Sequence, residues 1–127
     1  MGVKLSEIRE LLHANVFVGN NRLDLDVDTA CASDLMSDLL RGELEGSLLI
    51  TGLNSIHIVK TAVISGIVGV VLVRGKEPSI EVIEEAKKYD LPLLATSFSM
   101  YTACGRLFKK GIRGPDGRTS SSSKKGI

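Results

Sequence analysis

The 127-residue sequence has little cysteine, no long hydrophobic run and no leader-like start. Its cysteines, Cys31 and Cys104, form neither a CxxC pair nor a zinc-binding spacing, which favours a reducing, cytoplasmic setting. The longest apolar run, residues 62–73, is 12 residues long, whereas a membrane-spanning helix needs about 20. Charged residues such as Lys4 and Glu7 interrupt the start of the chain, so no signal peptide is predicted. We therefore expect a cytoplasmic protein that does not enter a membrane.

The sequence also lacks the short motifs that mark common nucleotide and catalytic sites. It contains neither a GxxxxGKS/T phosphate loop nor a GxGxxG fingerprint. The two histidines, His13 and His57, stand alone, and no Ser/His/Asp or Cys/His grouping can be argued. We therefore predict no catalytic residue, no metal ligand and no cofactor.

The charge is distributed unevenly along the chain. Residues 109–127 carry six Lys and Arg and one Asp, a charge of +5. Because the whole chain has a net charge of +1, residues 1–108 carry about −4. Residues 112–127, IRGPDGRTSSSSKKGI, have no apolar face and are predicted to be a disordered tail after a single domain, residues 1–111. Nucleic-acid binding would depend on this basic tail alone, without a docking motif, and is not expected.

Residues 48–76 contain the clearest structural pattern. Residues 47–51 form a short apolar run ended by Gly52, which indicates a buried strand. Asn54 or Ser55 can cap a helix that ends at Gly66, and residues 68–73 are nearly continuous and β-branched. Strand, helix and strand in this order predict a βαβ unit with a right-handed crossover.

The flanking sequence extends the same alternation of strands and helices. Further strands are expected at 15–19 and 91–95, and residues 23–28 form either an edge strand or an extended connection. Further helices are expected at 3–13, 30–41, 80–89 and 98–110, with Ser79 capping the third and Thr96 or Ser97 opening the last. The order predicts an α/β fold, a three-layer α/β/α sandwich with a mostly parallel sheet of 4–5 strands.

Three loops should meet at one edge of this sheet. In open parallel sheets ligands bind beyond the carboxyl ends of the strands, and the loops there offer hydroxyls, an amide, two cations and helix amino ends, which favour anions. The candidate ligand-binding residues are Thr51, Gly52, Asn54, Ser55, Arg74, Gly75, Lys76, Thr96 and Ser97. A small anionic or nucleotide ligand is physically plausible here. The alternative is that these residues are ordinary caps and turns.

Acidic residues in two other segments have simpler interpretations. Asp34 and Asp38 are expected on one face of the 30–41 helix, where Arg41 could offset their repulsion, and we interpret that face as solvent-exposed. The alternating aspartates of residues 24–28 lack the glycine and distal glutamate of a calcium loop. Cys31 and Cys104 are expected on the apolar sides of helices, as small hydrophobic residues.

Several of these segments together resemble the DRTGG domain family. The resemblance lies in LLITG at 48–52, VLVRGKEP at 71–78 and residues 83–96. Related domains form the N-terminal part of bifunctional HPr kinase/phosphorylase and accompany CBS domains or phosphotransacetylase. CASDLMSD at 31–38 and MYTACG at 100–105 resemble small stand-alone members in anaerobes, often encoded near iron-only hydrogenase and sensor-kinase-like genes.

The resemblance covers about residues 3–112 and implies an α/β regulatory or assembly domain that forms a homo-oligomer. Where an Asp-Arg pair is expected, this sequence has Asn54-Ser55. It has no kinase phosphate loop, so the resemblance does not imply kinase activity.

Three functions remain open at this point. The first is a non-catalytic cytoplasmic module that senses a small anionic ligand or acts as an oligomerising adaptor, with a protein partner among its possible ligands. The second is an enzyme, or an accessory subunit, acting on a phosphorylated metabolite in a hydrogenase- or phosphotransfer-related pathway. The third is a purely structural dimer.

Overall fold

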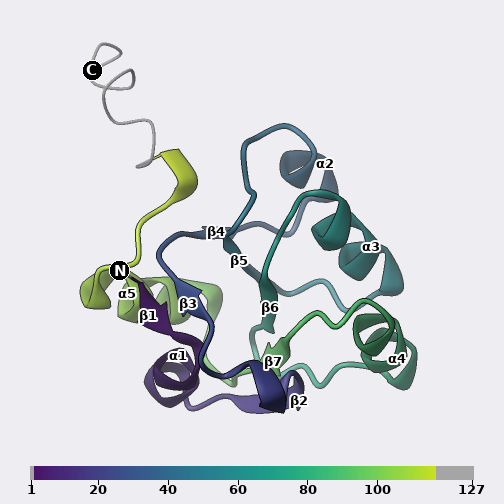
Figure 1. Ribbon diagram of the computed structural model, residues 1–127, viewed down its shortest axis with the longest axis horizontal. Helices are drawn as coiled ribbons and strands as arrows, with labels where there is room; N and C mark the ends of the chain where they lie inside the picture. The colour runs from purple at the N-terminus through teal and green to yellow at the C-terminus, as the bar shows by residue number, and fades with distance from the viewer. Residues whose placement is uncertain (1, 117–127) are drawn as a thin grey trace.

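The computed structural model describes residues 2–116 and contains a five-stranded sheet in the order β2-β7-β6-β5-β4 (Figure 1). Strands β4 to β7 run parallel to their neighbours, and β2 pairs antiparallel with β7. The strands are β2 Asn15–Val18, β4 Ala30–Ala32, β5 Leu48–Thr51, β6 Gly69–Leu72 and β7 Leu93–Ala95. The predicted mostly parallel sheet is confirmed.

Helices cover both faces of the sheet, which confirms the α/β fold class. Helices α1 (Leu5–Leu12) and α5 (Met100–Lys110) pack on one face, and α2 (Met36–Leu39), α3 (Ile56–Ile64) and α4 (Ile80–Lys88) cover the other (Figure 1). No helix in the described part of the chain is long and apolar enough to cross a membrane.

Side-chain alternation along β5 explains why the strand is apolar throughout. Leu48 and Ile50 belong to the apolar cluster under α1 and α5, whereas Leu49 belongs to the cluster under α2, α3 and α4. All three side chains are at most 1% exposed. A strand with helices over both faces buries successive residues in opposite directions, so hydrophobic residues follow one another without a break.

The predicted helix over 30–41 is wrong. Residues 30–32 form the edge strand β4, whose Ala30 and Ala32 pair in parallel with Leu48 and Ile50 of β5. Only Met36–Leu39 is helical. The backbone groups along one side of β5 need partners, and this pairing outweighs the weak helical preference of the sequence.

The elements around the central βαβ unit differ from prediction mainly at their ends. Ser79 caps α4 as expected, accepting a hydrogen bond from the Val82 N–H. Helix α5 begins at Met100 with Ser99 as its cap, rather than at 98 behind Thr96 or Ser97. After α3 the chain turns through Gly66, whose φ of 76° is favourable only for glycine.

Residues 23–28 take no part in the main sheet. A 3-10 turn (Asn20–Arg22) precedes β3 (Asp26–Val27), which pairs antiparallel with β1 (Val3–Lys4) in a separate two-stranded sheet. Lys4 Nζ lies 3.2 Å from the Asp26 carboxylate. The alternation in this segment thus belongs to a connection carrying a short strand.

The packed part of the chain extends past α5. Ile112 is 3% exposed, and Arg113 forms a parallel bridge with Thr29. The predicted tail began at Ile112, and its residues 117–127 lie outside the described part of the chain.

Candidate functional site

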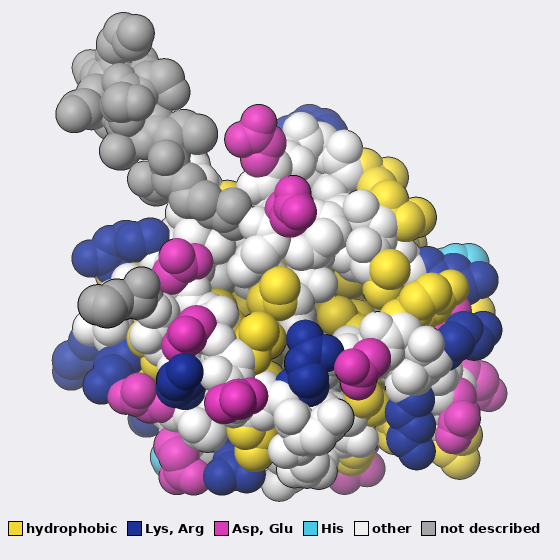
Figure 2. Space-filling model, in the orientation of Figure 1, with side chains coloured by type: hydrophobic (Ala, Val, Ile, Leu, Met, Phe, Trp, Pro, Cys, Tyr) yellow, Lys and Arg dark blue, Asp and Glu magenta, His cyan; other side chains and the backbone are white. Residues whose placement is uncertain are grey.

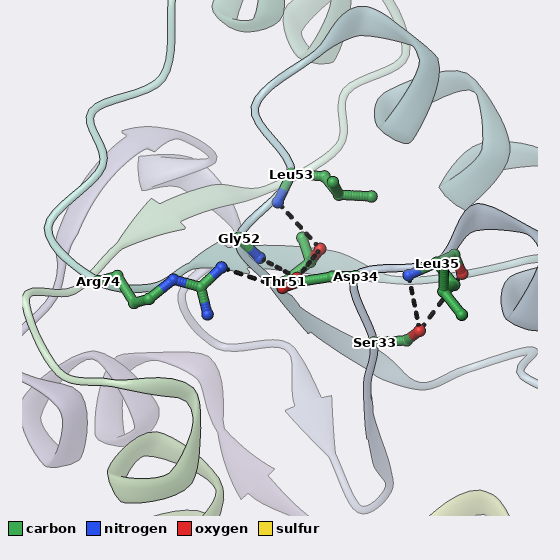
Figure 3. Close-up of polar contacts among 7 residues, drawn as sticks. All are labelled: Ser33, Asp34, Leu35, Thr51, Gly52, Leu53 and Arg74. Carbon is green, nitrogen blue, oxygen red and sulfur yellow. Dashed lines mark hydrogen bonds and ion pairs between the residues drawn. The ribbon is translucent and has the colours of Figure 1, made fainter.

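The carboxyl ends of β4, β5, β6 and β7 lie at one edge of the sheet, as their shared direction requires. The structure divides the nine candidate residues there into two groups and a pair with a different role. Thr51, Gly52 and Arg74 form a charged cluster (Figure 3). Gly75, Lys76, Thr96 and Ser97 line a small cavity. Asn54 and Ser55 belong to neither.

Arg74 reaches across the end of β5 and lies against Gly52. A Cβ atom on Gly52 would stand 1.9 Å from Arg74 Nη2, so the absence of a side chain creates the space for the guanidinium. Arg74 itself has a φ of 68°, which is uncommon for a residue with a side chain. Its N–H donates to the Phe98 carbonyl over 2.8 Å, and the Gly75 N–H donates to the Thr96 carbonyl over 3.0 Å. These bonds hold the turn that directs the Arg74 side chain.

Asp34 completes the cluster, and sequence reasoning did not select it. Its Oδ1 accepts the Gly52 N–H over 2.7 Å and the Thr51 hydroxyl over 3.2 Å, while Oδ2 accepts from Arg74 Nη2 over 3.0 Å (Figure 3). The Gly52 N–H, and after it Arg74 and Thr51, hold the pKa of Asp34 below its usual range against the opposing effect of partial burial. The side chains of Asp34 and Arg74 are 41% and 43% exposed.

Asp34 was missed because its segment was expected to be helical. In the structure Asp34 lies in the loop after β4, and Ser33 donates to the Asp38 carboxylate over 2.9 Å. A strand at 30–32 would have placed Asp34 at the carboxyl edge with the other loops.

The second group lines a cavity of about 170 Å³ at the end of β7. Its lining residues are His13, Asn15, Phe17, Gly75, Lys76, Glu77, Ala95, Thr96 and Ser97. Thr96 is buried, and its hydroxyl donates to the Leu12 carbonyl and accepts the Phe98 N–H. The basic residue Lys76 and the acidic residue Glu77 both line this cavity, together with His13.

Asn54 joins two loops, and Ser55 stands at the start of α3. The Asn54 amide donates to the Glu77 carbonyl over 2.9 Å and accepts the Ser79 N–H over 3.2 Å, so it ties the β6–α4 loop to the β5–α3 loop. Ser55 precedes α3 but its side chain makes no capping bond. Among residues 2–116, no group of three or more His, Cys, Asp or Glu side chains is placed to hold a metal ion.

The fold and this edge define an α/β domain in which loops from four parallel strands gather polar groups around one arginine. The family model for the DRTGG domain matches residues 7–109. The chain therefore belongs to the DRTGG domain family, as the resemblance predicted.

One solved structure shows the same fold. It is the crystal structure of the CBS and DRTGG domains of the regulatory region of Clostridium perfringens pyrophosphatase, complexed with its activator diadenosine tetraphosphate. The TM-score is 0.70 at 22% sequence identity, and the match covers 86% of this chain and 47% of that one. This chain thus spans about half the length of the pyrophosphatase fragment. Among proteins of curated function, none matches the sequence significantly.

Proposed function

We propose that this chain is a non-catalytic regulatory module that binds a small anionic ligand at the carboxyl edge of its parallel strands. The observation that carries the proposal is the convergence of the Gly52 N–H, the Thr51 hydroxyl and the Arg74 guanidinium on one carboxylate. A backbone N–H, a hydroxyl and a guanidinium are donors that also suit phosphate. The Gly52 N–H and the Thr51 hydroxyl are held in place by the sheet and do not need to be ordered when a ligand binds.

The neighbouring cavity sets the size of a second group that the same ligand can place beside the Arg74 cluster. At about 170 Å³ it is smaller than the roughly 300–1,000 Å³ typical of drug-sized ligands. A phosphate or a small carboxylate would fit between Lys76, Thr96 and Ser97. A larger ligand such as a nucleotide would place one group there and leave the remainder outside.

A regulatory role is supported by the family and by its structural relative. In the Clostridium perfringens protein, a DRTGG domain is part of a regulatory region that was crystallised with a nucleotide activator. The identity is 22% and the chain covers 47% of that structure, so the relative's ligand does not transfer directly. A nucleotide is therefore one class of ligand to test among several.

A thermal-shift screen of pyrophosphate, citrate, ATP and diadenosine tetraphosphate tests the proposal. A ligand at ~100 times its Kd should add about 2.7 kcal/mol to the free energy of unfolding, which for a domain of this size raises Tm by several degrees. Arg74→Ala should abolish the shift. Arg22→Ala is the matched control. It also removes an exposed Arg–Asp ion pair, in which Arg22 Nη1 lies 2.9 Å from Asp90 Oδ2, but this pair is at the amino end of the strands.

Two results would contradict the proposal. The first is the absence of a shift with every compound, and the second is an equal shift in wild type and Arg74→Ala. Turnover of a bound phosphate ester that is lost in a folded Arg74→Ala or Lys76→Ala variant would instead favour an enzyme acting on a phosphorylated metabolite.

A second candidate function is self-association, either alone or together with ligand binding. It is favoured by α5, where Tyr101 and Phe108 are 88% and 60% exposed beside an apolar cavity of about 370 Å³. Exposed aromatic residues around an apolar surface are typical of protein interfaces. Analytical ultracentrifugation of wild type and a Tyr101→Ser/Phe108→Ser variant tests it. A wild-type dimer that dissociates in the variant supports this function, whereas a monomeric wild type excludes it.

A further inference from the structure

Asp34 occupies the position that an anionic ligand would need. Its two carboxylate oxygens take three donors: the Gly52 N–H, the Thr51 hydroxyl and Arg74 Nη2, at 2.7, 3.2 and 3.0 Å. These are the donors to which the proposed function assigns the ligand. The edge of the sheet therefore presents an anion site that already holds an anion from the same chain.

Two of the three donors, the Gly52 N–H and the Thr51 hydroxyl, do not depend on Asp34 for their positions. Thr51 is fully buried at the end of β5, and its hydroxyl oxygen also accepts the Leu53 N–H over 3.1 Å. The Val73 N–H donates to the Thr51 carbonyl, and the N–H of Arg74 donates to Phe98. Removing Asp34 would thus leave a backbone amide and a hydroxyl aimed at the same point, with the Arg74 side chain attached to a fixed backbone beside them.

The segment that carries Asp34 is attached to the domain by few buried contacts. The Ser33 N–H donates to the Ile50 carbonyl at the end of β4. In the following segment, residues 34–40, only Leu39 is buried, while Leu35 and Leu40 are 61% and 63% exposed. Figure 2 shows hydrophobic side chains at the surface over α2 and α3. Within the segment, Ser33 Oγ accepts the Leu35 N–H and donates to Asp38. Apart from the Ser33 N–H and the bonds of Asp34, its polar bonds to the domain include those from Thr61 to Met36 Sδ and from Ser65 to the Leu39 carbonyl. Few buried contacts are typical of segments that open at low cost.

We propose that Asp34 is a built-in competitor: a phosphate or carboxylate ligand displaces it from Gly52, Thr51 and Arg74, and the release of segment 33–40 signals that the site is filled. This inference rests on the proposed function. The ligand binds only the fraction of molecules in which Asp34 has left the donors, so the apparent Kd of wild type exceeds the intrinsic one. Asp34, whose pKa lies below the usual 3.8, is ionised at neutral pH and competes there as an anion.

The first test is calorimetric titration of pyrophosphate and of citrate into wild type, Asp34→Ala, Asp34→Asn and Asp38→Asn. Both Asp34 variants should bind more tightly, Asp34→Ala by up to about fivefold, since an exposed ion pair contributes up to about 1 kcal/mol. Asp38→Asn removes the same charge from the same segment without touching the three donors, so it controls for electrostatic repulsion and should stay within about twofold of wild type. Asp34→Asn keeps the shape of the side chain if Asp34→Ala unfolds.

The second test measures hydrogen exchange in residues 33–40 of wild type with and without saturating pyrophosphate. Displacement of Asp34 predicts faster exchange in this segment in the complex. Binding by wild type with no gain in affinity in either Asp34 variant beyond that of Asp38→Asn would overturn the inference and leave the proposed function standing. Failure of all four proteins to bind either anion would overturn both.

Discussion

The two ends of the parallel strands are built from different chemistry. At the amino end, the Thr29 and Ser47 hydroxyls lie 2.8 Å apart in a buried pair, and their carbonyls accept the N–H groups of Leu48 and Val68. At the carboxyl end, Asp34 and Arg74 are both about two-fifths exposed and meet beside a glycine. The Thr29–Ser47 pair is closed to water, whereas the Asp34–Arg74 pair is open to it.

This difference separates stability from binding. A buried hydrogen bond costs most when one partner is removed, because the remaining group has already lost its water. An exposed ion pair contributes little, because water and salt can replace either partner. The amino end should therefore fix the fold, and the carboxyl end should be free to exchange its internal partners for a ligand. The predictions below test this division.

The largest effect is expected from Ser47→Ala, which removes the buried bond to Thr29. We expect the free energy of unfolding to fall by about 1–3 kcal/mol, measured by urea denaturation. Ser97→Ala is the matched change at the carboxyl end, where the side chain is exposed, and should stay within about 0.5 kcal/mol of wild type. Equal losses in the two variants would contradict the division.

The next effect is expected from Gly66→Ala, also at the amino end. An alanine at a φ of 76° costs about 1–2 kcal/mol, and its Cβ would stand 2.9 Å from Glu45 Cγ. Gly75→Ala separates the two causes, since Gly75 has a φ of 72° and a Cβ added there would meet nothing within 4 Å. Thermal unfolding should show a larger loss for Gly66→Ala. A larger loss for Gly75→Ala would show that crowding by Glu45 has no role.

Gly52→Ala should have a small effect on stability and a large one on binding. The new Cβ would stand 1.9 Å from Arg74 Nη2, the end of a flexible side chain that can swing into water, so we expect a loss under about 1 kcal/mol. The ligand-induced rise in Tm should disappear. Gly105→Ala is the control, because Gly105 lies in α5 with open space around it and should gain about 0.5–1 kcal/mol. A Gly52→Ala variant that keeps its ligand shift would place the ligand away from Arg74.

The smallest effect concerns pH. The pKa of Asp34 is lowered in the folded state from 3.8, so its contribution to stability is complete above that value and is lost as pH falls through it toward the lower folded pKa. The stability difference between wild type and Asp34→Asn should therefore be about 0.2–1 kcal/mol at pH 7 and shrink between pH 5 and pH 2. Chemical denaturation at a series of pH values measures it. A difference that grows on acidification would have the wrong sign.

The sequence predicted the interior strands of the sheet, whose apolar pattern arises because both faces of each strand are buried under helices. Residues 47–51 and 68–73 are continuous apolar runs, and both are interior strands of the sheet. It failed at residues 30–41, where Cys31, Leu35 and Leu39 recur at helical spacing although residues 30–32 form a strand. The structure explains why the pattern misled, since Cys31 and Leu39 pack in the same apolar cluster from a strand and a short helix.

The candidate site was predictable as a place but not as a set of contacts. Strand direction alone brought Thr51, Arg74 and Thr96 to one edge. The approach of Arg74 to Gly52 depends on the left-handed backbone at Arg74, which no local residue preference indicates. The assignment of Asp34 depends on a strand whose pairing is decided by β5, a segment 18 residues away.

The pairing of β2 with β7 determines the order in which the domain can be assembled. Val16 lies opposite Leu94, so the second strand of the chain has no partner until the last strand has been synthesised. Helix α1 likewise cannot complete its packing until α5 has formed, because the two helices share an apolar cluster. The β5–α3–β6 unit needs only neighbouring residues and can form first. Closing such long loops is slow, so the β2–β7 pairing and the packing of α1 against α5 are completed after the β5–α3–β6 unit.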